Sequence, residues 1–204
     1  MKGIAKDQGY GKFVVMIFED NDRYYDYVSH YGPQEGTFGM SAGMFIQDGY
    51  GHLVFPHREI SMTELVAGHE MAHALVSHLE MPLWLNEGLA VNMEGALKGV
   101  NSSPITHHSF DKHQKFWSEE NIQEFWTGES FARPDEGQEL SYQLARILVD
   151  NLSEDSVAFV QFCNQAHWRD SGEKAVVENY GVSLQTMMEN FLGDGSWRPK
   201  LVKA

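Results

Sequence analysis

The chain has 204 residues, of which 42% are hydrophobic and 22% charged, values typical of a soluble globular domain with a sizeable core. Its formal net charge of −14 disfavours nucleic acids and anionic membrane surfaces as partners, because a negative field repels phosphate. No apolar run approaches the roughly 18 residues of a membrane span. No secretory signal is visible, which predicts a cytoplasmic protein by default. The single cysteine, Cys163, excludes an internal disulfide.

The first third of the chain has the pattern of short strands and turns. A β-rich run covers Lys12–Phe18, and Glu19–Gly32 is predicted to be either a helix or a long loop. The stretch 36–56 then contains two candidate strands. They are joined at Asp48–Gly51 by the sequence DGYG, which is typical of a hairpin turn.

A helix with a marked start follows these strands. Ser61 and Glu64 have the spacing of a capping box, and Ile60 and Leu65 occupy the two positions of a hydrophobic staple around it. Alanine and leucine sustain the helix, and Pro82 is expected to end it. The pattern therefore predicts a helix of about five turns.

Helical periodicity continues towards the C-terminus. Trp84–Gly99 is predicted to be a second helix that Gly99 stops. The segment 100–137 is less regular and is a candidate cleft wall; its aromatic part, 116–131, either lines a pocket or belongs to the core. Further helices are expected at 137–152, with Leu140, Leu144, Ile147 and Leu148 on one stripe, and at 153–166, 172–181 and 183–193, the last capped by Ser183.

Strands that come first and helices that come later predict an α+β fold. We expect one domain over residues 1–204, with a β-rich part at about 10–58 and a mainly helical part at about 61–193.

The predicted first long helix carries the sequence HEMAH, from His69 to His73. Residues four apart share one face of a helix, so both imidazoles can point at a single metal ion. Glu70 projects about 100° away from His69, where it can stand beside a metal without binding it and act as a general base. A shuffled chain of this composition would contain such a motif only about 0.04 times, so a chance match is improbable but remains an alternative.

Glu87 is the candidate third metal ligand. From His73 to the helix end near Leu79 the rise is about 9 Å, and from Glu87 back to Pro82 it is about 7 Å. A tight turn at Glu80–Pro82 would therefore bring Glu87 level with the histidines. The alternative is a solvated glutamate that the dipole of the second helix favours near its N-terminus.

HEMAH followed by WLNEGLA resembles the gluzincins, the zinc peptidases of clan MA that bind zinc through two histidines and a downstream glutamate, and most closely the small bacterial peptidase-MA-like domains. The resemblance covers about residues 12–193 and implies a zincin-like fold, one Zn²⁺ per chain held by His69, His73 and Glu87, and a peptide or protein as substrate. It also implies that the substrate lies along an edge strand, either at 43–47 or at 51–57.

The implied reaction is metal-assisted hydrolysis of a peptide bond. Zinc activates a water molecule, and Glu70 accepts its proton and passes it to the leaving amine. Tyr142 resembles the tyrosine of the family's downstream helix and is the candidate that stabilises the oxyanion, although core packing of this tyrosine is an equal alternative. His107, His108 and His113 are other possible donors, and surface positions are expected for them.

The chain departs from the family pattern at one position. Many gluzincins have an acidic residue four positions after the glutamate ligand, and here that position is Val91. We therefore expect support for the histidines to come from Glu94 or from a backbone carbonyl. Two other readings stay open, a catalytically silent gluzincin-like module that binds a partner or is structural, and a chance motif in an unrelated helical protein.

Overall fold

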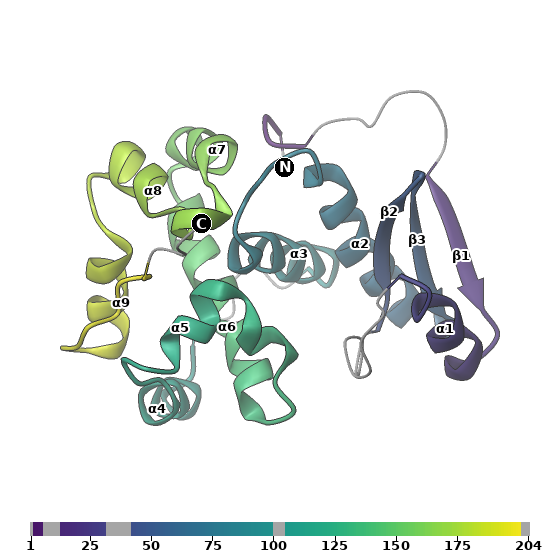
Figure 1. Ribbon diagram of the computed structural model, residues 1–204, viewed down its shortest axis with the longest axis horizontal. Helices are drawn as coiled ribbons and strands as arrows, with labels where there is room; N and C mark the ends of the chain where they lie inside the picture. The colour runs from purple at the N-terminus through teal and green to yellow at the C-terminus, as the bar shows by residue number, and fades with distance from the viewer. Residues whose placement is uncertain (1, 6–12, 32–41, 100–104, 201–204) are drawn as a thin grey trace.

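The computed structural model describes residues 2–5, 13–31, 42–99 and 105–200 (Figure 1). A small sheet with one helix on its outer face lies at one end, and the later helices fill the rest of the molecule, so the predicted α+β class is confirmed (Figure 1). Among the described residues, no helix has both the length and the apolar character needed to cross a bilayer. The elements are β1 (Val14–Phe18), α1 (Asn21–Val28), β2 (Met44–Asp48), β3 (Tyr50–Pro56), α2 (Ile60–Val76), α3 (Leu83–Leu97), α4 (His107–Phe116), α5 (Ile122–Thr127), η1 (Glu129–Ala132), α6 (Glu136–Ser153), α7 (Ser156–Gln165), η2 (Trp168–Asp170), α8 (Glu173–Tyr180) and α9 (Leu184–Leu192).

The described strands form one mixed sheet in the order β1-β3-β2. The central strand β3 pairs in parallel with β1 and antiparallel with β2. The β2–β3 hairpin turns at Gly49, whose φ of 72° suits glycine, so the predicted hairpin at DGYG is confirmed. Lys12 and residues 36–41, which the sequence assigned to strands, lie outside the described residues.

The two faces of the sheet are covered by different helices, because side chains alternate along each strand. Val54 of β3 packs with Tyr24 of α1, which settles the choice between a helix and a loop after β1 in favour of a helix. Leu53 and Phe55 pack on the other face with Val66 of α2. The helix that carries HEMAH therefore lies directly against the sheet.

The predicted start of α2 is wrong in detail. The N-cap is Glu59, with no side-chain capping bond, and Ser61–Glu64 lies inside the first turn. The amide of Met62 already donates to the carbonyl of Glu59, so the helix begins before Ser61 can act as a cap. Ile60 is 79% exposed and makes no hydrophobic staple with Leu65.

The end of α2 also differs from the prediction. The helix stops at Val76, and the amide of Leu79 donates to the carbonyl of Val76 in the turn that follows. Pro82 does not end α2. It is the N-cap residue of α3, a position whose missing N–H costs nothing. The two helices form the expected hairpin, with a connection at 77–82 that is longer than the predicted tight turn.

The segment 100–137 is more regular than predicted, because it contains α4, α5 and η1. Thr106 caps α4 by accepting a hydrogen bond from the amide of Ser109. The aromatic residues of this segment are core: Trp117, Phe125 and Trp126 are each at most 4% exposed. Their burial settles the choice between pocket lining and core in favour of core.

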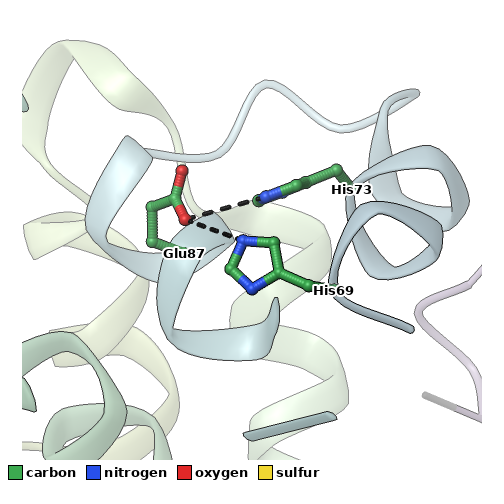
Figure 2. A group of neighbouring side chains, drawn as sticks. All are labelled: His69, His73 and Glu87. Carbon is green, nitrogen blue, oxygen red and sulfur yellow. Dashed lines mark ion pairs between the residues drawn. The ribbon is translucent and has the colours of Figure 1, made fainter. Parts of the chain in front are cut away.

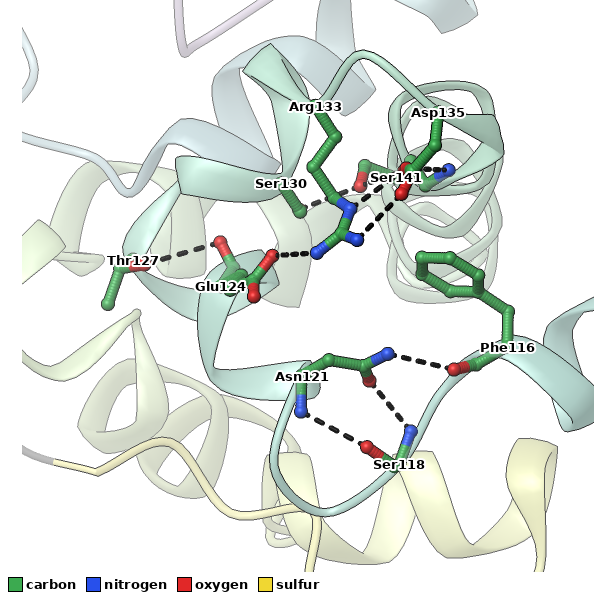
Figure 3. A network of polar contacts seen from close by, with 10 residues as sticks. Phe116, Ser118, Asn121, Glu124, Thr127, Ser130, Arg133, Asp135 and Ser141 are labelled. Carbon is green, nitrogen blue, oxygen red and sulfur yellow. Dashed lines mark hydrogen bonds and ion pairs between the residues drawn. The ribbon is translucent and has the colours of Figure 1, made fainter.

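A polar network around Arg133 fixes the start of α6 (Figure 3). The guanidinium binds both carboxylate oxygens of Asp135, pairs with Glu124 of α5 and lies over the ring of Phe116. Asp135 in turn caps α6 by accepting from the amide of Gly137. One side chain thus joins the end of α4, α5 and the N-terminus of α6.

The C-terminal helices surround the main hydrophobic core. The predicted stripe of α6 is buried, and the predicted cap of α9 is confirmed, since Ser183 accepts from the amide of Thr186. Cys163 of α7 is fully buried, as expected for a core residue, and burial raises the pKa of its thiol to about 12.

Candidate metal centre

The histidines of HEMAH and Glu87 converge on one point (Figure 2). His69 and His73 lie one turn apart on α2, with ring centroids 4.8 Å apart. Oε2 of Glu87, on α3, lies 3.4 Å from Nε2 of His69 and 3.7 Å from Nε2 of His73. The three residues predicted as ligands are therefore brought together, and they are the one group of His, Cys, Asp and Glu in the described chain with metal-site spacing.

Two of the spacings among the three candidate ligand atoms suit a tetrahedral ion. Bonds of about 2.0–2.1 Å to zinc place neighbouring ligand atoms about 3.4 Å apart in a tetrahedron. The two nitrogen–oxygen distances of 3.4 and 3.7 Å are close to this value. The side chains are only 13–16% exposed, so they are already held with little freedom.

Both imidazoles are held in place through their other ring nitrogen. Nδ1 of His69 lies 2.7 Å from Oε1 of Glu94, and Nδ1 of His73 lies 2.9 Å from Oδ1 of Asn86. Both oxygens are acceptors, which requires Nδ1 to carry the hydrogen and leaves Nε2 free to bind a metal. The expected contact with Glu94 is confirmed.

Asn86 was not predicted as a partner of His73. Its position directly before Glu87 is the signal that could have found it. Consecutive residues on a helix point about 100° apart. In an antiparallel helix hairpin, Glu87 can therefore face the ion while Asn86 reaches Nδ1 of His73 on the facing helix. Val91 contributes no polar contact, and Glu94, two turns beyond Glu87, takes the role expected there.

Oε2 of Glu87 is the unusual atom of the site. It is buried and has no hydrogen-bond partner among the described residues. A carboxylate oxygen in this state costs free energy unless a cation compensates it. Although burial lowers the pKa of His69, Glu87 and Glu94 outweigh this effect and raise it to about 10, so these carboxylates favour a positive charge on His69.

Glu70 stands beside the three candidate ligands without joining them. Its side chain is 6% exposed and points towards β2, where its carboxylate accepts a hydrogen bond from the backbone N–H of Phe45. A Cβ at Gly43 would lie 3.2 Å from Oε1 of Glu70, so the absence of a side chain at Gly43 makes room for the carboxylate. Burial raises the pKa of Glu70, against the opposing effect of the two imidazoles.

Tyr142 lies on α6 at the edge of the site. Its ring packs against Phe131 with centroids 5.1 Å apart. Burial raises the pKa of its phenol, and the negative charges of Glu87, Glu70 and Glu94 raise it further. Tyr142 therefore packs against the core, and its phenol lies within the electrostatic range of the site carboxylates.

Close contact between α3 and α6 produces this arrangement. A Cβ at Gly88 would lie 2.6 Å from the carbonyl oxygen of Ala145, so only glycine allows the two helices to approach this closely. Because Gly88 follows Glu87 directly, the contact brings the helix that carries Tyr142 to the side of the candidate ligand.

The other histidines are not part of the ligand group. His107 and His108 are exposed on α4, as expected. His113 was also expected at the surface, and this prediction is wrong. It is fully buried, because Phe191 of α9 packs against its ring. Its Nδ1 accepts a hydrogen bond from the indole N–H of Trp117. His52 of β3 is buried as well and bonds to the hydroxyl of Tyr27.

Comparisons of the chain with protein-family models, with curated proteins and with solved structures find no match.

Proposed function

We propose that the protein is a zinc-dependent metallopeptidase of the gluzincin type, which hydrolyses peptide bonds. The observation that carries the proposal is the convergence of the buried Oε2 of Glu87 with Nε2 of His69 and Nε2 of His73, at 3.4 and 3.7 Å. Each imidazole is already turned by a hydrogen bond on Nδ1. A metal ion would compensate the buried carboxylate and use both Nε2 atoms as ligands.

The donor set favours zinc in a catalytic role. Two imidazole nitrogens and one carboxylate oxygen suit Zn²⁺, and three protein ligands leave one position open for water or substrate. Non-haem iron oxygenases use a similar ligand set. The buried carboxylate of Glu70 beside the site favours hydrolysis over oxidation, because a hydrolase needs a group that accepts and returns a proton.

The side chains divide the reaction between them. When bound, the metal would polarise the scissile carbonyl and lower the pKa of the attacking water. Glu70 takes the proton of that water and returns it to the leaving amine. Asn86 and Glu94 keep the imidazoles in the orientation that the site needs. The protonated phenol of Tyr142 donates a hydrogen bond to the oxyanion that develops on the carbonyl.

The sheet supports one of the two expected positions for the substrate. β3 is paired on both sides and has no open edge, whereas β2 is paired only with β3 in the described residues. Phe45 of β2 also contacts Glu70. We therefore expect an extended peptide to add to the sheet along Met44–Asp48, with its backbone hydrogen-bonded to the strand.

The test combines metal analysis with a peptide-library digestion. We expect about one zinc per chain, cleavage by the parent protein, and loss of cleavage with retained zinc in Glu70→Gln. Glu64→Gln is the control, because Glu64 is an exposed glutamate on the same helix. Zinc without cleavage in the parent would instead support a silent module, and absence of bound metal after zinc is supplied at neutral pH would refute the metal site itself.

A further inference from the structure

The segment between α7 and α8, residues 166–172, contacts the connection between the two helices of the candidate metal centre. The amide of Trp168 donates to the carbonyl of Glu80 over 2.9 Å. Nε2 of His167 lies 3.0 Å from the carboxylate of the same glutamate. This segment, called the tether below, therefore holds the turn between α2 and α3 through both backbone and side chain.

A second contact joins the tether to the first turn of α3. The indole N–H of Trp84 donates to the carbonyl of Ser171 over 3.0 Å, and both residues are buried. The indole ring also packs against Phe125 and Phe162, with centroid distances of 6.4 and 6.2 Å. Trp84 is thus fixed in position and in rotation about the helix axis.

The backbone of the tether is strained at the residue that accepts this bond. Ser171 has a φ of 56°, and it is the one non-glycine residue of the described chain with a positive φ. Its hydroxyl donates to the carbonyl of Trp126, and its amide donates to the carbonyl of Trp168. A serine keeps this conformation only when its surroundings enforce it, and here it directs the carbonyl at Trp84.

From these contacts we infer that Trp84 and the tether are positioning elements of the metal centre, an inference that rests on the proposed function. Asn86 and Glu87 follow Trp84 within one turn of α3, so any rotation of this turn moves a metal ligand and the partner of a second ligand together. The bond from Trp84 to Ser171 restrains this rotation, and the contacts of the tether with Glu80 hold the turn that joins α2 and α3.

The experiment measures metal binding in Trp84→Phe. Phenylalanine keeps most of the packing but loses the bond to Ser171. We expect zinc affinity, measured by competition with a chromophoric chelator, to fall about tenfold, as for other residues that support metal ligands. The visible absorption spectrum of the Co²⁺-substituted protein should change as well, because the ligand geometry changes.

Trp197→Phe is the matched control. Trp197 is also buried, and its indole also donates to a backbone carbonyl, that of Gly193, but it lies on the C-terminal segment after α9. Both variants should unfold at lower urea concentrations than the parent. Only Trp84→Phe should change the zinc affinity and the Co²⁺ spectrum.

The outcomes separate the two proposals. A parent protein that binds no metal contradicts the proposed function. A parent that binds zinc, with a Trp84→Phe variant of equal affinity and spectrum, overturns the role of the tether. If Trp84→Phe does not fold, His167→Ala replaces it: loss of the pair with Glu80 should weaken zinc binding about threefold, and unchanged binding would overturn the inference in the same way.

Discussion

His113 gives the chain a pH-dependent stability whose sign and size follow from the structure. Its ring is fully buried between Trp117 and Phe191, and burial lowers its pKa to about 4, against a smaller opposing effect of Gln143. In the unfolded chain the pKa of a histidine is about 6.5. Between these values the unfolded state binds the proton and the folded state does not, so the free energy of unfolding decreases as the pH falls through this window.

The size of the effect follows from the two pKa values. Between pH 7 and pH 5 the linkage relation gives a loss of about 2 kcal/mol from this one residue. His113→Asn should remove this loss, because the asparagine does not titrate and its Oδ1 can take the place of Nδ1 as acceptor for Trp117. The variant will be less stable at pH 7, because a smaller side chain leaves a cavity.

The assay is urea unfolding of the parent and of His113→Asn at pH 7 and pH 5. The measured quantity is the difference between the two pH dependences, so protonation of other groups cancels. His108→Asn serves as control, since His108 is exposed on the same helix and should leave the pH dependence of the parent unchanged. Equal pH dependence in the parent and in His113→Asn would refute the argument from burial.

Two further predictions concern the candidate metal centre. Glu94→Gln should weaken zinc binding by about 10- to 100-fold in a chelator competition, because the amide is a poorer partner for Nδ1 of His69; Glu178→Gln, which alters an exposed glutamate on α8, should not. Gly88→Ala should lower the free energy of unfolding by about 1–3 kcal/mol in urea, because its Cβ would lie 2.6 Å from the carbonyl oxygen of Ala145. An unchanged unfolding midpoint for Gly88→Ala would show that α3 and α6 do not pack as closely as described.

The convergence of His69, His73 and Glu87 could be predicted from the sequence because its geometry is local. His69 and His73 share a helix face by spacing alone, and Glu87 lies on the next helix, after one short connection. The errors at the ends of α2 did not matter for this reason. The helix begins before Ser61 and ends at Val76, but the depth of Glu87 opposite the histidines depends on the hairpin as a whole.

The elements and contacts that the sequence did not predict depend on tertiary structure. The bond between Trp84 and Ser171 joins residues 87 positions apart, and no local pattern marks either partner. The helices α4 and α5 were not predicted from the sequence, and the burial of Trp117 and Phe125 in the main core stabilises this segment. The place of Tyr142 likewise depends on the contact of α6 with α3.

The order of events during folding follows from the hairpin of α2 and α3. Its two histidines and its glutamate belong to one short stretch of chain, whereas the parallel pairing of β1 with β3 closes a much longer loop. Contacts between near neighbours form faster than contacts that close long loops. The hairpin can therefore form before β1 pairs with β3. A metal ion bound at that stage would favour the native packing of α2 and α3 over other arrangements of these helices.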